Sequence, residues 1–193
     1  MTHVCLYYFQ YINILTDTVT TMATGLNMPR GIAFTPSGTL AYLLSSTQVL
    51  TMPVGGGTTS VLAGQTFGGW MDGQGTDAKF QTPSALVVHP GTGTMYIADM
   101  RNHRIRVCTA LGLVSTLVGS DESSKTDGAA SIATFDNPSG IVMDLASTYL
   151  YVSCKGGSGG AALRKVRTFL SSSNTSACVF LYILRCLIVL LCF

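Results

Sequence analysis

The side chains best suited to metal binding or acid–base chemistry are widely separated in this sequence. The three histidines, His3, His89 and His103, lie in different segments, and none has the short ligand spacing typical of a metal site. The cysteines include no C-x-x-C pair, so neither a zinc site nor a disulfide framework is indicated and we expect reduced thiols. The six cysteines are Cys5, Cys108, Cys154, Cys178, Cys186 and Cys192.

Residues 72–77, with the sequence DGQGTD, begin like a calcium-binding loop. An EF-hand loop carries Asp or Asn at its third and fifth positions, where this segment has Gln74 and Thr76. Asp-Gly is also a frequent turn sequence, and a turn between two structural units is the better interpretation. No nucleophile elbow or phosphate-binding glycine motif follows a strand, and the glycine-rich residues 156–160 are expected to form a hairpin loop. We therefore expect no metal, no cofactor and no catalytic residue.

Composition favours a folded and rather apolar chain. Hydrophobic residues make up 47% of the 193 residues and charged residues 10%, so the chain can bury a core. The 11 Lys and Arg nearly balance the 9 Asp and Glu, and the net charge of +2 is too small to steer the whole molecule onto nucleic acid or acidic lipid. Binding of that kind would need a local patch.

An internal repeat of about 55 residues organises the chain. Five residues recur 55 positions later: Asp72, Gly73, Ala78, Phe80 and Pro83 return as Asp127, Gly128, Ala133, Phe135 and Pro138. Residues 62–64 and 95–97 have counterparts at the same displacement. A third copy lies upstream, where Pro29 and Tyr42 precede Pro83 and Tyr96 by 54 positions. The chain therefore contains parts of four units.

Each unit is predicted to form four short β-strands. Between residues 84 and 119 the apolar runs SALVVHP, TMYIAD, HRIRVCT and LVSTLVG are separated by Gly, Pro, Asp and Asn. Four antiparallel strands per repeat are typical of a propeller blade. We expect an all-β, incomplete β-propeller of about three blade equivalents, followed by a hydrophobic C-terminal segment. The expected divisions are a partial blade at 1–25, blades at 26–80 and 81–135, a partial blade at 136–170 and a tail at 171–193.

Residues 83–119 resemble an NHL repeat, most closely in the sequence YIADMRNHRIR at 96–106. The preceding segment AGQTFGGWMDGQGTDAKFQTPSA is similar to the linker of the longer NHL variants, and the resemblance extends over about residues 18–168. It implies that Asp99, Asn102 and His103 are structural, forming turns and bridging strands. Ser45 and Cys154 replace Asp99 in the neighbouring units, which indicates degenerate blades. Because related propellers include lyases and lactonases with a divalent ion on the axis, a fragment of such an enzyme is an alternative.

Two basic clusters and one tryptophan are the candidate interaction residues. The clusters are Arg101, Arg104 and Arg106 in one unit and Arg164, Lys165 and Arg167 in the next. They could bind RNA through phosphates, although a row of solvated side chains on an outer strand is the simpler interpretation. Trp70 either packs within its loop or anchors a ligand.

After residue 170 the repeat ends and a nearly continuous apolar run begins. Residues 177–193 are just long enough for a transmembrane helix, although Arg185 lies near the centre. The alternatives are a membrane anchor, an apolar strand on the open propeller edge, a lipidation signal, or a sequence unrelated to the expected blade. Asn174 begins a glycosylation sequon, which matters only in a secretory compartment.

A non-catalytic scaffold that binds a protein partner is the function we expect from the sequence, with RNA binding and enzymatic activity as alternatives. A closed propeller needs about four to eight blades, more than this chain supplies. Because unpaired blade edges are templates for strand pairing, we also expect self-association or a longer parent protein. The chain would be membrane-anchored if the tail at 177–193 is native and cytoplasmic otherwise.

Overall fold

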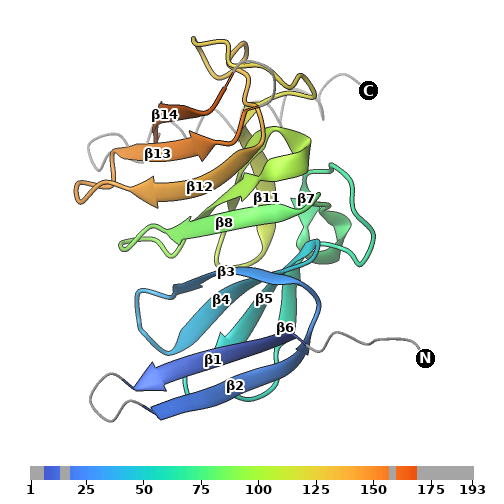
Figure 1. The fold of residues 1–193 in the computed structure, drawn as a ribbon, viewed down its shortest axis with the longest axis vertical. Helices are drawn as coiled ribbons and strands as arrows, with labels where there is room; N and C mark the ends of the chain where they lie inside the picture. The colour runs from blue at the N-terminus through green and yellow to red at the C-terminus, as the bar shows by residue number, and fades with distance from the viewer. Residues whose placement is uncertain (1–6, 14–17, 157–159, 169–193) are drawn as a thin grey trace, which may run out of the picture.

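The computed structural model describes residues 7–13, 18–156 and 160–168, which form four antiparallel β-sheets. The first is a hairpin of β1 (Tyr7–Asn13) and β2 (Thr18–Leu26). The second contains β3 (Pro29–Phe34), β4 (Leu40–Ser45), β5 (Gln48–Pro53) and β6 (Ser60–Ala63) in sequence order. Figure 1 shows the sheets side by side along the long axis of the molecule, in chain order.

The third sheet is the most complete blade. It contains β8 (Pro83–Val88), β9 (Met95–Asp99), β10 (Arg104–Cys108) and β11 (Leu113–Gly119). The short strand β7 (Gly73–Gln74) pairs with the outer edge of β11, so the linker from the preceding blade adds a fifth strand. Two 3₁₀ turns, η1 (Gly75–Asp77) and η2 (Met100–Asn102), lie beside these strands.

The fourth sheet has three strands among the described residues. They are β12 (Pro138–Met143), β13 (Tyr149–Cys154) and β14 (Ala162–Arg167). One edge of β14 pairs with β13. Among the described residues, no strand pairs with its other edge. This blade therefore lacks a counterpart of β11 in the described part of the chain.

The same strand register begins each of the three larger sheets. A proline opens the innermost strand, and its partners across the strand pair are Ser45, Asp99 and Cys154 in successive sheets. The residue before each proline has a positive φ: 48° at Met28, 55° at Thr82 and 50° at Asn137. Left-handed backbone is uncommon outside glycine, so its recurrence at one repeat position indicates that the chain must turn in the same way into every blade.

Apolar side chains fill the space between neighbouring sheets. One cluster joins the second and third sheets and contains Tyr42, Phe80 and Val114. Another joins the third and fourth sheets and contains Tyr96, Phe135 and Val152. Since sheets pack face to face through such layers, each blade depends on its neighbour for the burial of its apolar face.

The expected fold class is confirmed: the chain is an incomplete propeller of antiparallel blades, and the four predicted strand segments between 84 and 119 are β8 to β11. The glycine-rich segment lies between β13 and β14, as expected for a hairpin loop. The predicted unit boundaries stay predictions. The tail at 171–193 lies outside the described residues, and within these no helix is long and apolar enough to cross a membrane.

Candidate interaction surfaces

Arg106 lies on β10 with a fully buried side chain. Its guanidinium donates hydrogen bonds to two carboxylates, at 2.9 Å to Asp99 Oδ2 and 2.6 Å to Asp72 Oδ1. It also donates to the main-chain oxygens of Lys79 and Met71, at 3.0 and 2.8 Å. The guanidinium carbon lies 5.2 Å from the centre of the Phe80 ring. The buried cation is thereby compensated, and it fastens the linker loop at 71–80 to the blade.

Arg164 on β14 makes the equivalent contacts one repeat later. It donates to Asp127 Oδ1 at 2.5 Å and to the main-chain oxygens of Thr126 and Thr134, and it lies 4.9 Å from the Phe135 ring. Each of these four partners stands 55 residues after its counterpart around Arg106. Arg164 itself stands 58 residues after Arg106, because the loop between β13 and β14 is longer. One arginine of each basic cluster, Arg106 and Arg164, therefore occupies the same place in its unit and clamps the linker loop to the blade.

Asp99 closes the turn before β10. Its carboxylate accepts hydrogen bonds from the Gln81 amide at 2.8 Å, from Asn102 Nδ2 at 2.7 Å and from Arg106. Burial raises the pKa of Asp99 to about 6, while these donors oppose the rise. In the second sheet the Ser45 hydroxyl bonds to both main-chain groups of Asn27, which occupies the place of Gln81. In the second and third sheets, this position therefore fixes the segment through which the chain enters the blade.

Asn102 and His103 complete the same turn. Asn102 Nδ2 also donates to the Gly69 oxygen at 2.8 Å, which joins the turn to the linker loop. His103 has left-handed backbone with a φ of 54°, and its Nδ1 accepts a hydrogen bond from the Asn137 amide at 3.2 Å. These contacts support the structural role that the sequence predicts for Asp99, Asn102 and His103.

Trp70 is held at the surface in the linker loop between β6 and β7. Its indole N–H donates to Thr116 Oγ1 at 3.2 Å, and the Arg104 guanidinium carbon lies 4.3 Å from the centre of the ring. Arg104 in turn pairs with Asp121 at 2.9 Å, and this pair holds the pKa of Asp121 below its ordinary value. Trp70 nevertheless keeps 48% of its surface exposed, and Phe67 in the same loop is 78% exposed. An ordered, half-exposed aromatic beside a cation has the chemistry of an interface anchor.

The six basic residues singled out in the sequence do not form one exposed row. Arg104 and Arg106 are buried, which differs from both sequence-based interpretations, since each required side chains facing solvent. Arg101, Lys165 and Arg167 are exposed. Lys165 Nζ lies 3.7 Å from the centre of the Tyr149 ring, so this cation is placed over an aromatic face. Among these six residues, Arg164 is the third arginine that forms an ion pair with an aspartate of this chain.

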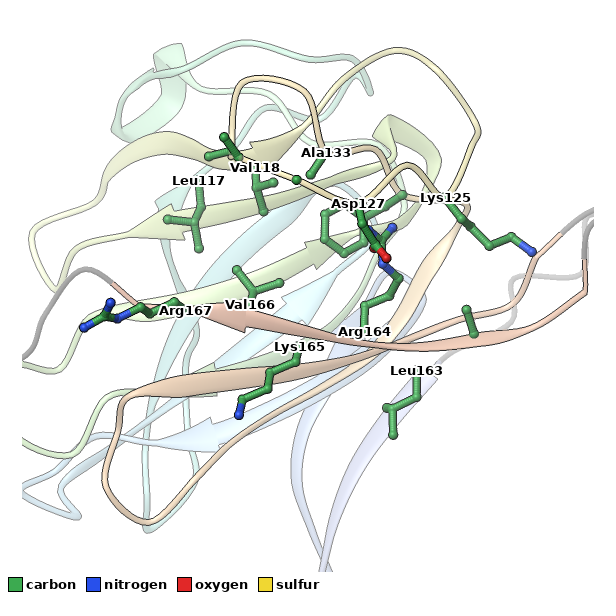
Figure 2. A pocket seen from close by; sticks show the side chains of 15 residues that line it. Leu117, Val118, Lys125, Asp127, Ala133, Leu163, Arg164, Lys165, Val166 and Arg167 are labelled. Atoms are coloured by element: carbon green, nitrogen blue, oxygen red, sulfur yellow. The ribbon is translucent and has the colours of Figure 1, made fainter.

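A cavity of about 700 Å³ lies between β14, β11 and the loop that contains Asp127. Figure 2 shows Arg164 and Val166 on the side of β14 that faces Asp127 and the β11 residues Leu117 and Val118, with Leu163 on the opposite side. The cavity wall is apolar in part and charged in part. Its charged residues are one carboxylate, Asp127, which is already paired with Arg164, and four cations, Lys125, Arg164, Lys165 and Arg167, while its apolar lining includes Leu117, Val118, Ala133 and Phe135. The space can therefore accept apolar side chains.

The remaining candidates for chemistry have ordinary structural contacts. His89 Nδ1 accepts a hydrogen bond from the Gly91 amide at 3.1 Å. Cys108 and Cys154 are free and buried, and burial raises the pKa of the Cys108 thiol to about 12. Among the described residues no group of three His, Cys, Asp or Glu side chains is placed to bind a metal ion. His3 and the other four cysteines lie outside the described residues.

The ion-pair partners Asp72 and Asp127 are the residues that the sequence-based reasoning missed. The Asp-Gly repeat predicted a turn but did not assign a partner to the carboxylate. Two features of the sequence indicate such an ion pair when they are taken together. An Asp recurs 55 residues apart, and a strand with basic residues recurs at a similar place in each unit.

The fold places this chain among the β-propellers. No family model matches the chain. Among solved structures it is similar to an auxiliary nutrient binding protein from Bacteroides thetaiotaomicron, with 26% identity, a TM-score of 0.65 and coverage of 74% of this chain and 39% of that one. A protein of unknown function from the same organism gives 24% identity and a TM-score of 0.70, covering 83% of this chain and 42% of that one. A gluconolactonase from Xanthomonas campestris is 16% identical, with a TM-score of 0.55 and coverage of 85% and 46%.

Sequence comparison adds the repeat family. Over 86 residues, 44% of this chain, the sequence is 31% identical to NHL repeat-containing protein 2 from Gallus gallus. Together with the propeller fold, this similarity supports an NHL-repeat propeller family for the chain, at low identity. It spans 12% of the length of that curated relative and about half or less of the propeller chains compared.

Proposed function

We propose that this chain is a non-catalytic propeller scaffold that binds a protein partner through the Trp70 loop, residues 65–72. The observation that carries the proposal is the state of Trp70, which is fixed by Arg104 and Thr116 yet half exposed. Trp and Arg are the residues most enriched in the energetic centres of protein interfaces. An aromatic ring that is already ordered loses little conformational freedom when a partner binds.

The rest of the loop supports the same interpretation. Phe67 and Met71 are 78% and 42% exposed, so three large apolar side chains lie within five residues of sequence. Aromatic residues and Met are enriched at interfaces relative to other surface. A non-catalytic role is supported by the engagement of the carboxylates Asp72, Asp99 and Asp127 in ion pairs with buried or nearly buried arginines.

The test begins with a photo-crosslinking amino acid at position 67 of the full chain, expressed in its native cells. The crosslinked partner is identified by mass spectrometry, and its affinity for the purified chain is then measured by calorimetry. We expect Trp70→Ala to weaken this binding at least about thirtyfold, which corresponds to about 2 kcal/mol. Leu145→Ala is the matched control, since Leu145 is fully exposed on the turn between β12 and β13. Equal affinities of the two variants would contradict the proposal.

Enzymatic activity is the competing function, because one propeller of similar fold is a gluconolactonase. The purified full chain would be assayed with glucono-δ-lactone and with added divalent cations. We expect no hydrolysis above the buffer rate. Turnover that requires a metal would replace the scaffold proposal.

A further inference from the structure

The cavity beside β14 has the lining that a fourth blade strand needs. In the third sheet, β11 lies between β10 and the linker loop, where Val114 pairs with Gly73 and the Thr116 amide and hydroxyl bond to Asp72 at 3.1 and 3.0 Å. Val114 also belongs to the same buried cluster as Phe80. β11 thus uses two surfaces, a strand edge and the Asp-Gly loop.

The fourth sheet presents both surfaces with no described strand between them. The cavity is lined by β14 residues, by Asp127 and Gly128, and by Phe135. The last three are the repeat counterparts of Asp72, Gly73 and Phe80, which β11 approaches in the third sheet. β14 occupies the place of β10, as the matching contacts of Arg164 and Arg106 establish. The cavity is therefore the seat of a strand equivalent to β11.

The residues that immediately follow β14 are poorly suited to this seat. A turn of the same length as that between β10 and β11 would put Ser172 and Ser176 at the places of Val114 and Val118. In the third sheet both of these valines are buried, with 1% and 5% of their surface exposed. Two hydroxyl groups would replace two buried apolar side chains, which removes the driving force for strand docking.

The next segment of the chain has the missing property. Residues 178–184, with the sequence CVFLYIL, are apolar and rich in the β-branched and aromatic residues that favour strands. The polar residues 168–177 separate them from β14 and can form the connection, because the entropy cost of closing a loop rises only with the logarithm of its length. An unpaired strand edge beside a partly apolar cavity binds such a segment through backbone hydrogen bonds and alternate side chains.

We propose that residues 178–184 of the same chain occupy this seat as the fourth strand of the last blade. The proposal is independent of the Trp70 loop, which lies on the preceding linker. It makes the last blade self-contained, with β14 paired on both edges.

The experiment measures amide hydrogen exchange in the full chain and compares β14 with β10. Two triple variants place charges on alternate positions of the segment. They are V179D/L181D/I183D and F180D/Y182D/L184D. A seated strand turns one set of side chains to the cavity, so we expect one triple variant to reduce the protection of β14 at least about tenfold and the other to have a much smaller effect. Protection of β10 serves as the control for folding.

Three results would overturn the proposal. Equal effects of both triple variants, or none, would exclude a strand with one buried face. Loss of β14 protection in Asn174→Pro, with neither triple variant effective, would assign the seat to residues 171–177. Protection of β14 that rises with protein concentration, together with a dimer in light scattering, would assign it to a second copy of the chain.

Discussion

Arg106 and Arg164 occupy the same position in successive blades but differ in their surroundings. Arg106 is fully buried. Its partner Asp72 lies against β11, and 43% of the Asp72 side chain is exposed. Arg164 is 10% exposed and its partner Asp127 is 91% exposed. Arg106 also has a second, buried carboxylate in Asp99, where the last blade has Cys154. The same ion-pair contacts are therefore shielded from solvent around Arg106 and hydrated around Arg164. Their contributions to the free energy of unfolding should differ strongly.

In the second sheet, uncharged residues occupy the positions of the arginine and of its buried carboxylate. Leu50 stands at the strand position of Arg106, and Ser45 stands at that of Asp99. Leu50 packs with Leu43 and Met52 in an apolar cluster that includes Ala23 of β2. The blade position thus accepts either a compensated cation or an apolar side chain. In none of these three sheets does this position hold a buried charge without a partner.

The largest expected effect is that of Arg106→Ala. Removal of the guanidinium leaves the buried Asp99 carboxylate without its cation, which costs about 3–5 kcal/mol of the free energy of unfolding. The double variant R106L/D99S reproduces the pair found in the second sheet and should recover most of this loss. Urea denaturation at pH 7 measures both. A double variant no more stable than Arg106→Ala would show that packing around the guanidinium, rather than its charge balance, holds the blade.

The pH dependence of stability should come from the third sheet. The folded-state pKa of Asp99, about 6, lies above its ordinary value of 3.8, so between these values the folded chain binds a proton that the unfolded chain does not. The free energy of unfolding should therefore be greater at pH 5 than at pH 7, and the contribution is lost as the pH rises through 6. Asp99→Asn should remove this part of the slope. Urea denaturation of both proteins at the two pH values gives the comparison, and identical slopes would contradict the assignment to Asp99.

Arg164→Ala should cost much less than Arg106→Ala. Its partner Asp127 stays hydrated when the guanidinium is removed, so the loss is about 1 kcal/mol and comes mainly from contacts with Phe135 and main-chain oxygens. The same denaturation assay measures it. If residues 178–184 cover the clamp as β11 covers Asp72, the cost would move toward that of Arg106→Ala, and V179D/L181D/I183D or its partner variant would reduce it again.

Local sequence patterns predicted the strands better than the clamps. The four runs between 84 and 119 became β8 to β11 because apolar strands and turn residues are read from neighbouring positions. The burial of Arg106 depends on Asp72, 34 residues earlier in sequence, and on main-chain oxygens of the same linker. Alternating basic residues on a strand are normally solvated, so no local rule indicated that this face turns inward. The stacking of Arg104 on Trp70 is likewise a contact between a linker and a blade.

The smallest expected effect on stability is that of Arg104→Ala, because the partner of this buried side chain, Asp121, is 87% exposed and stays hydrated when the guanidinium is removed. Asp121 is exposed, so loss of the ion pair and of the cation–π contact should cost about 0.5–1 kcal/mol. The chain has one tryptophan, so its fluorescence reports on this loop alone. We expect a red-shifted emission and faster quenching by iodide in Arg104→Ala, because the ring loses one of its two restraints and becomes more hydrated. Thr116→Val, which removes the hydrogen bond to the indole but keeps the cation, should give a smaller shift. An unchanged emission spectrum in Arg104→Ala would contradict this expectation. It would mean that the hydrogen bond from Asn102 to the Gly69 oxygen, rather than the contact with Arg104, holds Trp70 in position.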